Sequence, residues 1–292
     1  MHQSTNSDER RNAWRAISIF LVITMALSAV FQGLMIYQGH MTRMLVTATM
    51  WSPGVAAVLT CLILNRDVSS LPWGWGQWRW NWYAWALPIA YGLAMYLPVW
   101  IFGLGGASFG NEETLTRWSS EIIVGDGINL LAVIFYVVIL GTIGVFGSAA
   151  NALGEEIGWR GFMIWEFRKV MPFWLVGLGS GLIWGLWHWP GILFADYNAG
   201  EGNLVLQMLL FTTGIAAQGI IYAYFVFKSK SLWPAVILHA SHNLFLQTIL
   251  TPLTTRGENT HFYIDEFGIM LPIVSCILAV YFYNRAKREG LT

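Results

Sequence analysis

Long apolar stretches separated by short polar segments dominate the chain. Eight of these stretches are roughly 20 residues long, the length at which a helix crosses the hydrocarbon layer of a membrane. They cover residues 14–37, 46–64, 83–104, 128–150, 173–194, 204–227, 232–250 and 267–284. The pattern predicts an all-α fold, a polytopic membrane helical bundle with about eight transmembrane helices, in which residues 1–292 form a single membrane domain.

Composition narrows the classes of partner. Hydrophobic residues make up 56% of the 292 residues and charged residues only 11%, against about 25% charged residues in a typical soluble domain. Lys plus Arg and Asp plus Glu balance at 16 each, so no overall field favours nucleic acid. Composition therefore indicates membrane lipid as a partner; it does not indicate nucleic acid.

The positions of the basic residues predict an orientation. If the eight stretches alternate in direction, 13 Lys and Arg residues lie on the face that holds both termini and only Arg43, Arg117 and Arg256 lie on the other. Basic residues stay on the cytoplasmic side of a membrane. We therefore expect a multi-pass protein of the cell membrane with both termini in the cytoplasm.

Tryptophan is concentrated between the second and third stretches, in residues 73–82. Indole rings suit the headgroup layer, with the ring toward lipid and the N–H toward water. An interfacial anchor is the favoured interpretation, and a stacking platform for a sugar or nucleotide is the alternative.

A cluster of charge interrupts the apolar pattern after residue 150. Glu156 and Arg160 are four residues apart, the helical spacing at which a carboxylate and a guanidinium meet, so we expect them to pair. Glu155 points about 100° away around the helix and can face a cavity. A solvated helix end is the alternative interpretation, and residues 161–172 resemble a helix end emerging through the cytoplasmic interface.

Two further polar groups lie in later apolar stretches. His188 ends one of them just before Pro190, and His239 and Asn243 share a helical face in another. Polar side chains inside a membrane are unfavourable unless they contact one another or water, so we expect them to converge with Glu155. A carboxylate beside an imidazole can take a proton from water, and an imidazole with an amide can donate to an oxyanion.

Other hydrolytic chemistries find weaker support. The chain has no His-Glu-x-x-His zinc-protease motif. Ser180 lies between two glycines and resembles an exposed nucleophile, but a small residue in that setting is more typical of helix packing.

Together, the three groups resemble the CPBP family, the CAAX protease and bacteriocin-processing membrane endopeptidases that include type II CAAX prenyl proteases and Abi proteins. The family motifs Glu-Glu-x-x-x-Arg, Phe-x-x-x-His and His-x-x-x-Asn correspond to Glu155–Arg160, Trp184–His188 and His239–Asn243. The similarity covers a core of about residues 151–246. The one departure is Trp184, where the motif has phenylalanine.

The resemblance implies an intramembrane endopeptidase acting on a membrane-associated or lipid-modified substrate. Glu155 would be the general base, His188 would assist it, and His239 with Asn243 would bind the oxyanion, while Glu156, Arg160 and Trp184 would hold the site. No cofactor is favoured. Zinc held by Glu155, His188 and His239 is the alternative.

Two other functions stay open: a non-enzymatic bacteriocin-immunity or scaffold membrane protein, and a proton-coupled transporter. For the peptidase we expect a cavity that opens toward the basic, cytoplasmic side. The depth of Glu155 is also undecided. Either the fourth helix continues past residue 150 with Glu155 well inside it, or the fifth begins later or tilts.

Overall fold

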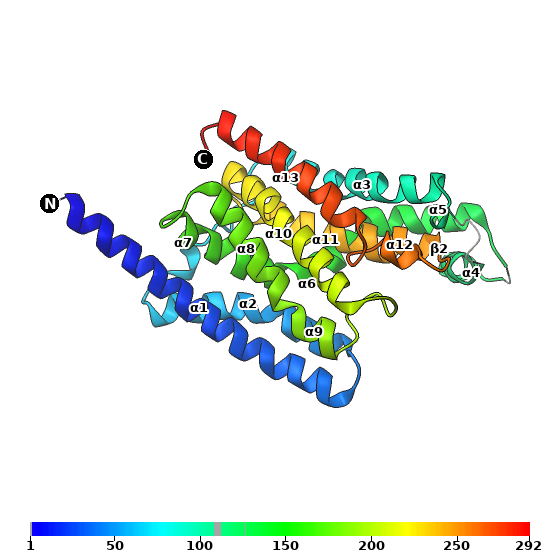
Figure 1. Cartoon of the computed structure of the whole chain (residues 1–292), viewed down its shortest axis with the longest axis horizontal. Coiled ribbons are helices and arrows are strands. Elements are labelled where there is room, and N and C mark those ends of the chain that lie inside the picture. The colour runs from blue at the N-terminus through cyan, green and yellow to red at the C-terminus, as the bar shows by residue number, and fades with distance from the viewer. Residues whose placement is uncertain (1, 108–111, 126) are drawn as a thin grey trace.

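The structure, a computed structural model, describes residues 2–107, 112–125 and 127–292, with the side chains of residues 2–6 left aside. Long helices make up nearly all of it (Figure 1). Six of these helices are uninterrupted: α1 (His2–Gln38), α2 (Arg43–Ile63), α3 (Trp78–Ile101), α8 (Phe173–Trp187), α10 (Leu204–Ser229) and α13 (Met270–Arg288).

Two further helical runs contain π-helical turns. The first comprises α5 (Leu130–Ile139), η2 (Leu140–Gly144), α6 (Val145–Glu156), η3 (Ile157–Met163) and α7 (Ile164–Arg168). The second comprises α11 (Trp233–His242), η4 (Asn243–Leu250) and α12 (Thr251–Leu253). Here η2, η3 and η4 are π-helical. Such turns are rare and occur often at functional sites.

The connections hold short elements. These are η1 (Val68–Ser70), α4 (Glu112–Ser120), α9 (Trp189–Phe194), η5 (Thr260–Phe262), and the antiparallel pair β1 (Gly106–Ala107) and β2 (Thr254–Thr255). Local chemistry sets several helix starts: the side chains of Asn129 and Asn203 accept from backbone N–H groups of α5 and α10, as N-cap residues do.

The all-α prediction is confirmed, and each predicted stretch contains a helix. Within the described residues, five helices are long and apolar enough to cross a membrane, so eight spans remain a prediction. The predicted end of the fourth stretch at residue 150 is wrong, because that helical run continues to Arg168. Pro190 lies in the first turn of α9, directly after α8 ends, a helix position where proline is tolerated.

Glycines allow α2 to approach the run that carries the two glutamates. A Cβ on Gly154 would lie 2.7 Å from the Cα of Trp51, and a Cβ on Gly158 would lie 2.5 Å from the Cβ of Pro53. Real Cβ atoms do not approach this closely, so any larger residue would push the helices apart. The backbone around Glu155 and Glu156 is therefore held directly against α2.

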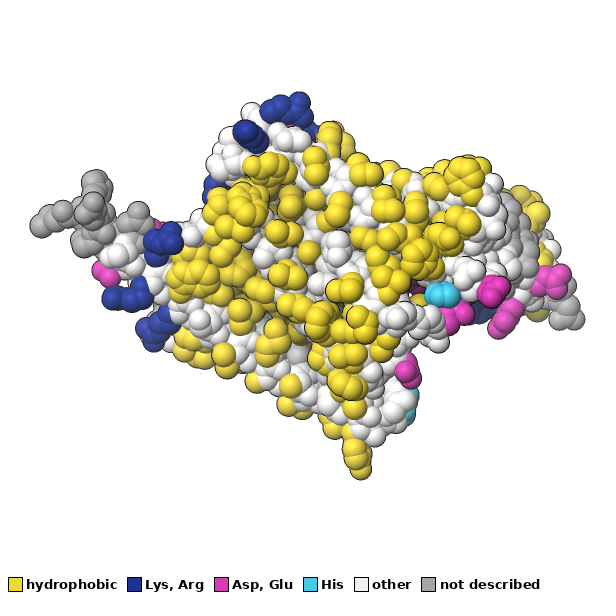
Figure 2. Space-filling model, viewed as in Figure 1, with side chains coloured by type: hydrophobic (Ala, Val, Ile, Leu, Met, Phe, Trp, Pro, Cys, Tyr) yellow, Lys and Arg dark blue, Asp and Glu magenta, His cyan; other side chains and the backbone are white. Residues whose placement is uncertain are grey.

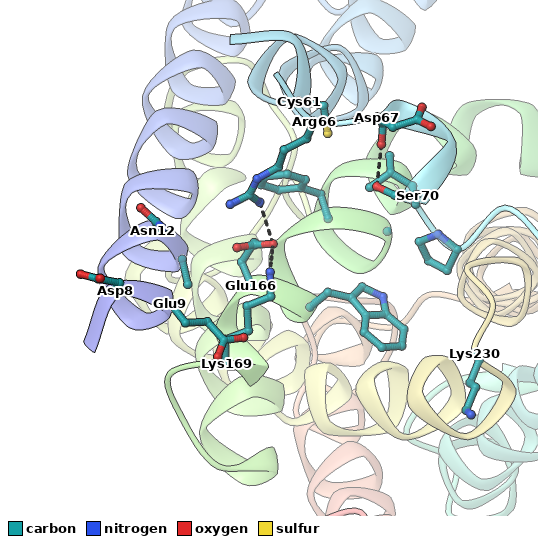
Figure 3. A pocket seen from close by; sticks show the side chains of 16 residues that line it. Asp8, Glu9, Asn12, Cys61, Arg66, Asp67, Ser70, Glu166, Lys169 and Lys230 are labelled. Atoms are coloured by element: carbon teal, nitrogen blue, oxygen red, sulfur yellow. Dashed lines mark hydrogen bonds and ion pairs between the residues drawn. The ribbon is translucent and has the colours of Figure 1, made fainter. Parts of the chain in front are cut away.

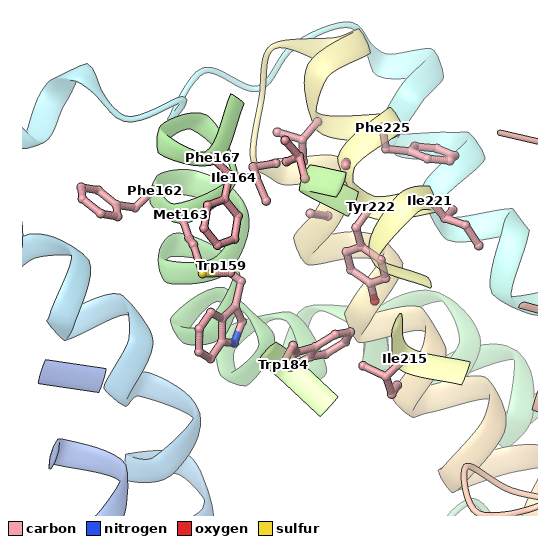
Figure 4. Packing of buried hydrophobic residues seen from close by; sticks show 14 of the residues in the cluster. Trp159, Phe162, Met163, Ile164, Phe167, Trp184, Ile215, Ile221, Tyr222 and Phe225 are labelled. Atoms are coloured by element: carbon pink, nitrogen blue, oxygen red, sulfur yellow. The ribbon is translucent and has the colours of Figure 1, made fainter. Parts of the chain in front are cut away.

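Residues 159–167 pack into the main hydrophobic core rather than into an interface. Trp159, Phe162, Met163, Ile164 and Phe167 are buried and belong to one hydrophobic cluster with Tyr222 and Phe225 of α10; in Figure 4 Phe162 points to the side away from α10. The interpretation of this segment as a helix end in the membrane interface is wrong up to Phe167. In residues 161–172, only Arg168, Lys169 and Pro172 are exposed.

The tryptophan-rich segment contains both exposed and buried rings. Trp78 and Trp82 are 65% and 61% exposed, but Trp80 is buried, and Trp73 donates from its indole to the Val68 carbonyl. The interfacial anchor remains a prediction for the two exposed rings. It is wrong for Trp80, which packs against Tyr224 and Phe225.

The bundle has two chemically different ends. We call the first the basic end; it contains the start of α1, residues 64–77, 168–172 and 228–232, and the C-terminus. Contacts across these segments join Arg10 to the Val170 carbonyl, Arg168 to the Leu291 carbonyl and Lys228 to Glu289. Figure 1 places both chain ends there, and in Figure 2 most of the Lys and Arg side chains in view gather at the same end.

The second, the loop end, contains residues 39–42, 102–107, 195–203 and 254–269. Thr260 donates to the Leu104 carbonyl, and Glu201 lies 3.8 Å from Arg256, so these connections contact one another. Figure 2 shows acidic side chains at this end. Membrane helices therefore separate a basic surface from an acidic one.

Candidate active site

All four predicted catalytic side chains line one cavity. Glu155, His188, His239 and Asn243 border a space of about 160 Å³, together with side chains from α1, α2, α10 and residues 254–269. The predicted convergence of these costly polar groups is therefore observed. The remaining lining residues are Gln32, Met35, Met41, Val46, Thr49, Met50, Trp184, Trp187, Gly191, Tyr197, Phe211, Ile215, His242, Gln247 and Glu266.

Glu155 is almost fully buried, at 1% exposure, one residue before the end of α6. Its Oε2 accepts a hydrogen bond of 2.6 Å from the indole Nε1 of Trp184. The motif's phenylalanine could not donate this bond. The departure from the family pattern thus supplies a polar contact to the proposed general base.

Glu156 is the centre of a buried ion pair. Its Oε1 accepts from Arg160 Nη1 at 3.1 Å and lies 2.8 Å from His239 Nδ1. Glu156 and Arg160 are both fully buried, so the predicted pairing is confirmed and the solvated-end alternative is wrong. The carboxylate also fixes one nitrogen of His239, which leaves Nε2 as that ring's other polar atom.

Aromatic rings enclose the guanidinium of Arg160. Its Cζ lies 4.1 Å from the Trp184 ring centroid and 4.2 Å from that of Tyr222. Cation–π attraction is strongest where the cation is desolvated. These two rings and Glu156 together stabilise a charge that would otherwise be very unfavourable in this interior.

His188 lies at the junction of α8 and α9. Its Nδ1 lies 2.8 Å from the Trp184 carbonyl, which can only accept, so Nδ1 carries the proton and Nε2 is the free acceptor of the neutral ring. The ring stacks on Tyr197, with centroids 5.8 Å apart, and meets Phe211 edge-on at 5.2 Å.

Helix length accounts for the common depth of Glu155 and His188. Glu155 lies thirteen residues before Arg168, and His188 lies fifteen residues after Phe173. At 1.5 Å per residue, both are about 20 Å from the basic end. Of the two possibilities left open by the sequence, the continuous fourth helix is correct.

A second carboxylate–imidazole pair, not predicted from the sequence, lies in the same cavity. His242 Nε2 lies 2.9 Å from Glu266 Oε1. Tyr91 hydrogen-bonds to the other nitrogen of His242, and Tyr197 donates to Glu266 Oε2. Both residues could have been noticed in the sequence. His242 directly precedes the motif residue Asn243, and Glu266 directly precedes an apolar stretch.

The cavity lies toward the loop end of the bundle. Its lining includes Met41 in the turn between α1 and α2, Tyr197 after α9 and Glu266 before α13. Among the described residues, none that lines it belongs to a connection at the basic end. The expectation that it opens toward the basic side is therefore wrong.

A larger space of about 970 Å³ lies at the basic end, and Figure 3 shows its lining. There Glu166 pairs with Arg66 at 2.9 Å and with Lys169 at 2.6 Å. None of the four predicted catalytic residues borders it. We place the candidate active site in the smaller cavity, because the polar motif residues converge there.

The side-chain geometry does not support the alternative zinc set. In the part of the chain that the structure describes, no three His, Cys, Asp or Glu side chains are close enough to share a metal ion. Glu155, His188 and His239 line one cavity but do not form such a group.

Comparison with known proteins gives the same assignment as the motifs. Residues 129–245 match the family described as Type II CAAX prenyl endopeptidase Rce1-like. This chain has an Rce1-like core. That core includes all seven motif residues, from Glu155 to Asn243, and the resemblance seen in the sequence is confirmed.

A curated relative supports the same family. The chain is 26% identical over 129 residues to CAAX prenyl protease 2 of Methanococcus maripaludis. This similarity covers 42% of the chain and 44% of the relative, so it spans less than half the length of either protein.

Proposed function

We propose that the protein is an intramembrane endopeptidase that hydrolyses a peptide bond of a membrane-associated or lipid-modified substrate with a water molecule activated by Glu155. The observation that carries this proposal is the convergence of Glu155, His188, His239 and Asn243 on one cavity. The Rce1-like core adds support.

In this proposal Glu155 is the general base. Trp184 holds its Oε2, which leaves Oε1 to take a proton from water as the water oxygen attacks the carbonyl carbon. Glu155 then returns that proton to the leaving nitrogen as the C–N bond breaks. General acid–base catalysis of this kind contributes typically 10²- to 10⁴-fold to a rate, on the order of 3 to 5 kcal/mol.

His188 assists by accepting a hydrogen bond from the same water at Nε2. Its Nδ1 bonds the carbonyl of Trp184, the residue whose indole bonds Glu155. One residue therefore sets the spacing of both groups that contact the water. Such preorganisation lowers the entropy lost on reaching the transition state.

His239 and Asn243 bind the oxyanion of the tetrahedral intermediate. For His239 to donate from Nε2, its ring carries protons on both nitrogens, and the Glu156 carboxylate 2.8 Å from Nδ1 stabilises that form. A donor aimed at developing negative charge is worth about 2.7 to 4 kcal/mol in comparable sites.

The pair of Glu266 and His242 positions the neighbouring residues. Glu266 accepts from Tyr197, and the Tyr197 ring stacks on His188. Through Tyr197, the pair therefore supports one face of the His188 imidazole. Neither Glu266 nor His242 is required to contact the reacting atoms.

A direct test uses purified full-length protein in proteoliposomes with a lipid-tethered peptide in ¹⁸O-enriched water. We expect two fragments, one of which carries a single ¹⁸O in its new carboxylate. Uncleaved peptide would contradict the proposal and favour the scaffold or transporter alternatives. A parallel preparation of the Glu155→Gln/His188→Ala/His239→Ala variant controls for contaminating peptidases.

A further inference from the structure

The described lining of the candidate active site points toward one end of the bundle. Met41 lies in the turn between α1 and α2, is 40% exposed and borders the cavity. Tyr197 and Glu266, from two other connections at the loop end, also border it. The cavity thus reaches the surface at the loop end, among three separate connections.

Charge identifies which end faces the cytoplasm. Arg160 must be removed from the sequence-based count because it is fully buried. Twelve Lys and Arg residues then remain at the basic end, against Arg43, Arg117 and Arg256 on the opposite side. An excess of this size in short connections places the basic end in the cytoplasm.

Acidic residues strengthen the contrast. The segments at the loop end carry Glu201 and Glu258, and α4 and the turn after it add Glu112, Glu113 and Glu121. In Figure 2 the visible acidic side chains lie mainly at the end opposite the basic cluster. The loop end as a whole is therefore more acidic than the basic end.

We propose that the active-site cavity opens on the non-cytoplasmic side of the membrane, and that its substrate is a polypeptide segment presented at that outer face, as in an exported or membrane-inserted chain. The orientation follows from charge and cavity position alone. The substrate class rests in addition on the proposed peptidase function.

The lining indicates what such a segment carries at the cleaved bond. Met35, Met41, Met50, Phe211 and Trp187 supply much of the apolar lining of the cavity. Methionine side chains are flexible and adapt to apolar groups of different shape. We expect an apolar residue beside the scissile bond.

Cysteine labelling tests the orientation. In a full-length background with Cys61→Ala and Cys276→Ser, intact cells are treated with a membrane-impermeant maleimide. Met41→Cys is expected to label without permeabilisation, whereas Gln77→Cys, exposed at the basic end, labels only after it. The reverse pattern would overturn the proposal.

A second measurement tests the opening itself. A charged thiol reagent on Met41→Cys should reduce peptide cleavage at least tenfold by blocking the mouth. The same reagent on Met44→Cys, an exposed neighbour outside the lining, should leave cleavage unchanged. Equal effects at both positions would show that the mouth lies elsewhere and would overturn the proposal.

Substrate sidedness completes the test. A lipid-tethered peptide added outside right-side-out vesicles should be cleaved, and the same peptide added outside inside-out vesicles should survive. Cleavage only in inside-out vesicles would refute the outer-face substrate. If neither preparation cleaves, the peptidase function fails, whereas labelling of Met41→Cys and Gln77→Cys still decides the orientation.

Discussion

Trp184 connects the two groups that we propose contact the attacking water. Its indole bonds Glu155, its carbonyl bonds His188, and its ring covers the Arg160 guanidinium. In the sequence, Trp184 was visible only as an aromatic substitution for phenylalanine. Its polar role could not be predicted, because an indole N–H finds its partner through tertiary packing.

Arg160 provides the first prediction at this scale. Arg160→Met should destabilise the protein by about 3 to 5 kcal/mol, because it leaves the buried Glu156 carboxylate without its guanidinium. Thermal unfolding in detergent measures this as a lower Tm. Arg168→Met, at an exposed position, is the control.

Adding Glu156→Gln to Arg160→Met should recover part of the lost Tm, because the unpaired charge is then removed. If Arg160→Met unfolds at the same temperature as Arg168→Met, the ion pair does not have the structural role assigned to it.

The positioning role of Glu266 gives the second prediction. Glu266→Gln should lower kcat roughly 10- to 100-fold with little change in KM or Tm, because Tyr197 and His242 lose a charged acceptor and the face of His188 is less firmly held. Peptide cleavage kinetics measure both constants. Glu258→Gln, exposed in the same segment, should match the wild type. If Glu266→Gln lowers Tm enough to account for its lost activity by unfolding, Glu266 has a merely structural role.

At the scale of elements, the approach of α2 to α6 and η3 sets the backbone beneath the site. Two glycines flank the glutamate pair, and each would place a Cβ against α2. Both π-helical turns η3 and η4 begin beside motif residues, directly after Glu156 and at Asn243. A regular helical period does not include these turns, so the sequence could predict which residues share a face only approximately.

Gly154 tests this packing. In Gly154→Ala the new methyl would meet the Trp51 and Met50 backbone at 2.7 to 2.8 Å, so we expect about 1 to 3 kcal/mol of destabilisation and reduced cleavage as Glu155 shifts. Gly147→Ala, on the same helix with nothing within 4 Å, should retain both Tm and activity. Equal Tm values for the two variants would contradict the close approach.

At the scale of the whole molecule, apolar periodicity predicted the helices well because membrane helices must be long and continuous. Motif spacing predicted the four side chains of the cavity. The predicted direction of the cavity opening was wrong. That direction depends on how far the fourth helical run extends and on Glu266, Tyr197 and Met41. These three residues lie in connections, which have no periodic pattern.

The C-terminus supplies a prediction of pH dependence. Desolvation alone would raise the pKa of Glu289, but hydrogen bonds from Lys228, Arg285 and Tyr224 lower that pKa from 4.5 to about 2. A carboxylate with a lowered folded-state pKa stabilises the fold above the unfolded value of about 4.5, and that contribution is lost as pH falls toward 2. The Tm difference between wild type and Glu289→Gln should therefore be constant at pH 5 to 7 and shrink below pH 4; a difference that grows with acidity would contradict this ion pair.

The cleavage rate of Glu155→Gln tests the central claim most directly. Glutamine keeps the size of the side chain and an oxygen for Trp184 but cannot take a proton. With lipid-tethered peptide at saturating concentration, we predict that kcat falls at least about 100-fold, while Tm and peptide binding stay close to those of the wild type. A folded Glu155→Gln protein that cleaves the peptide at the wild-type rate would contradict the account.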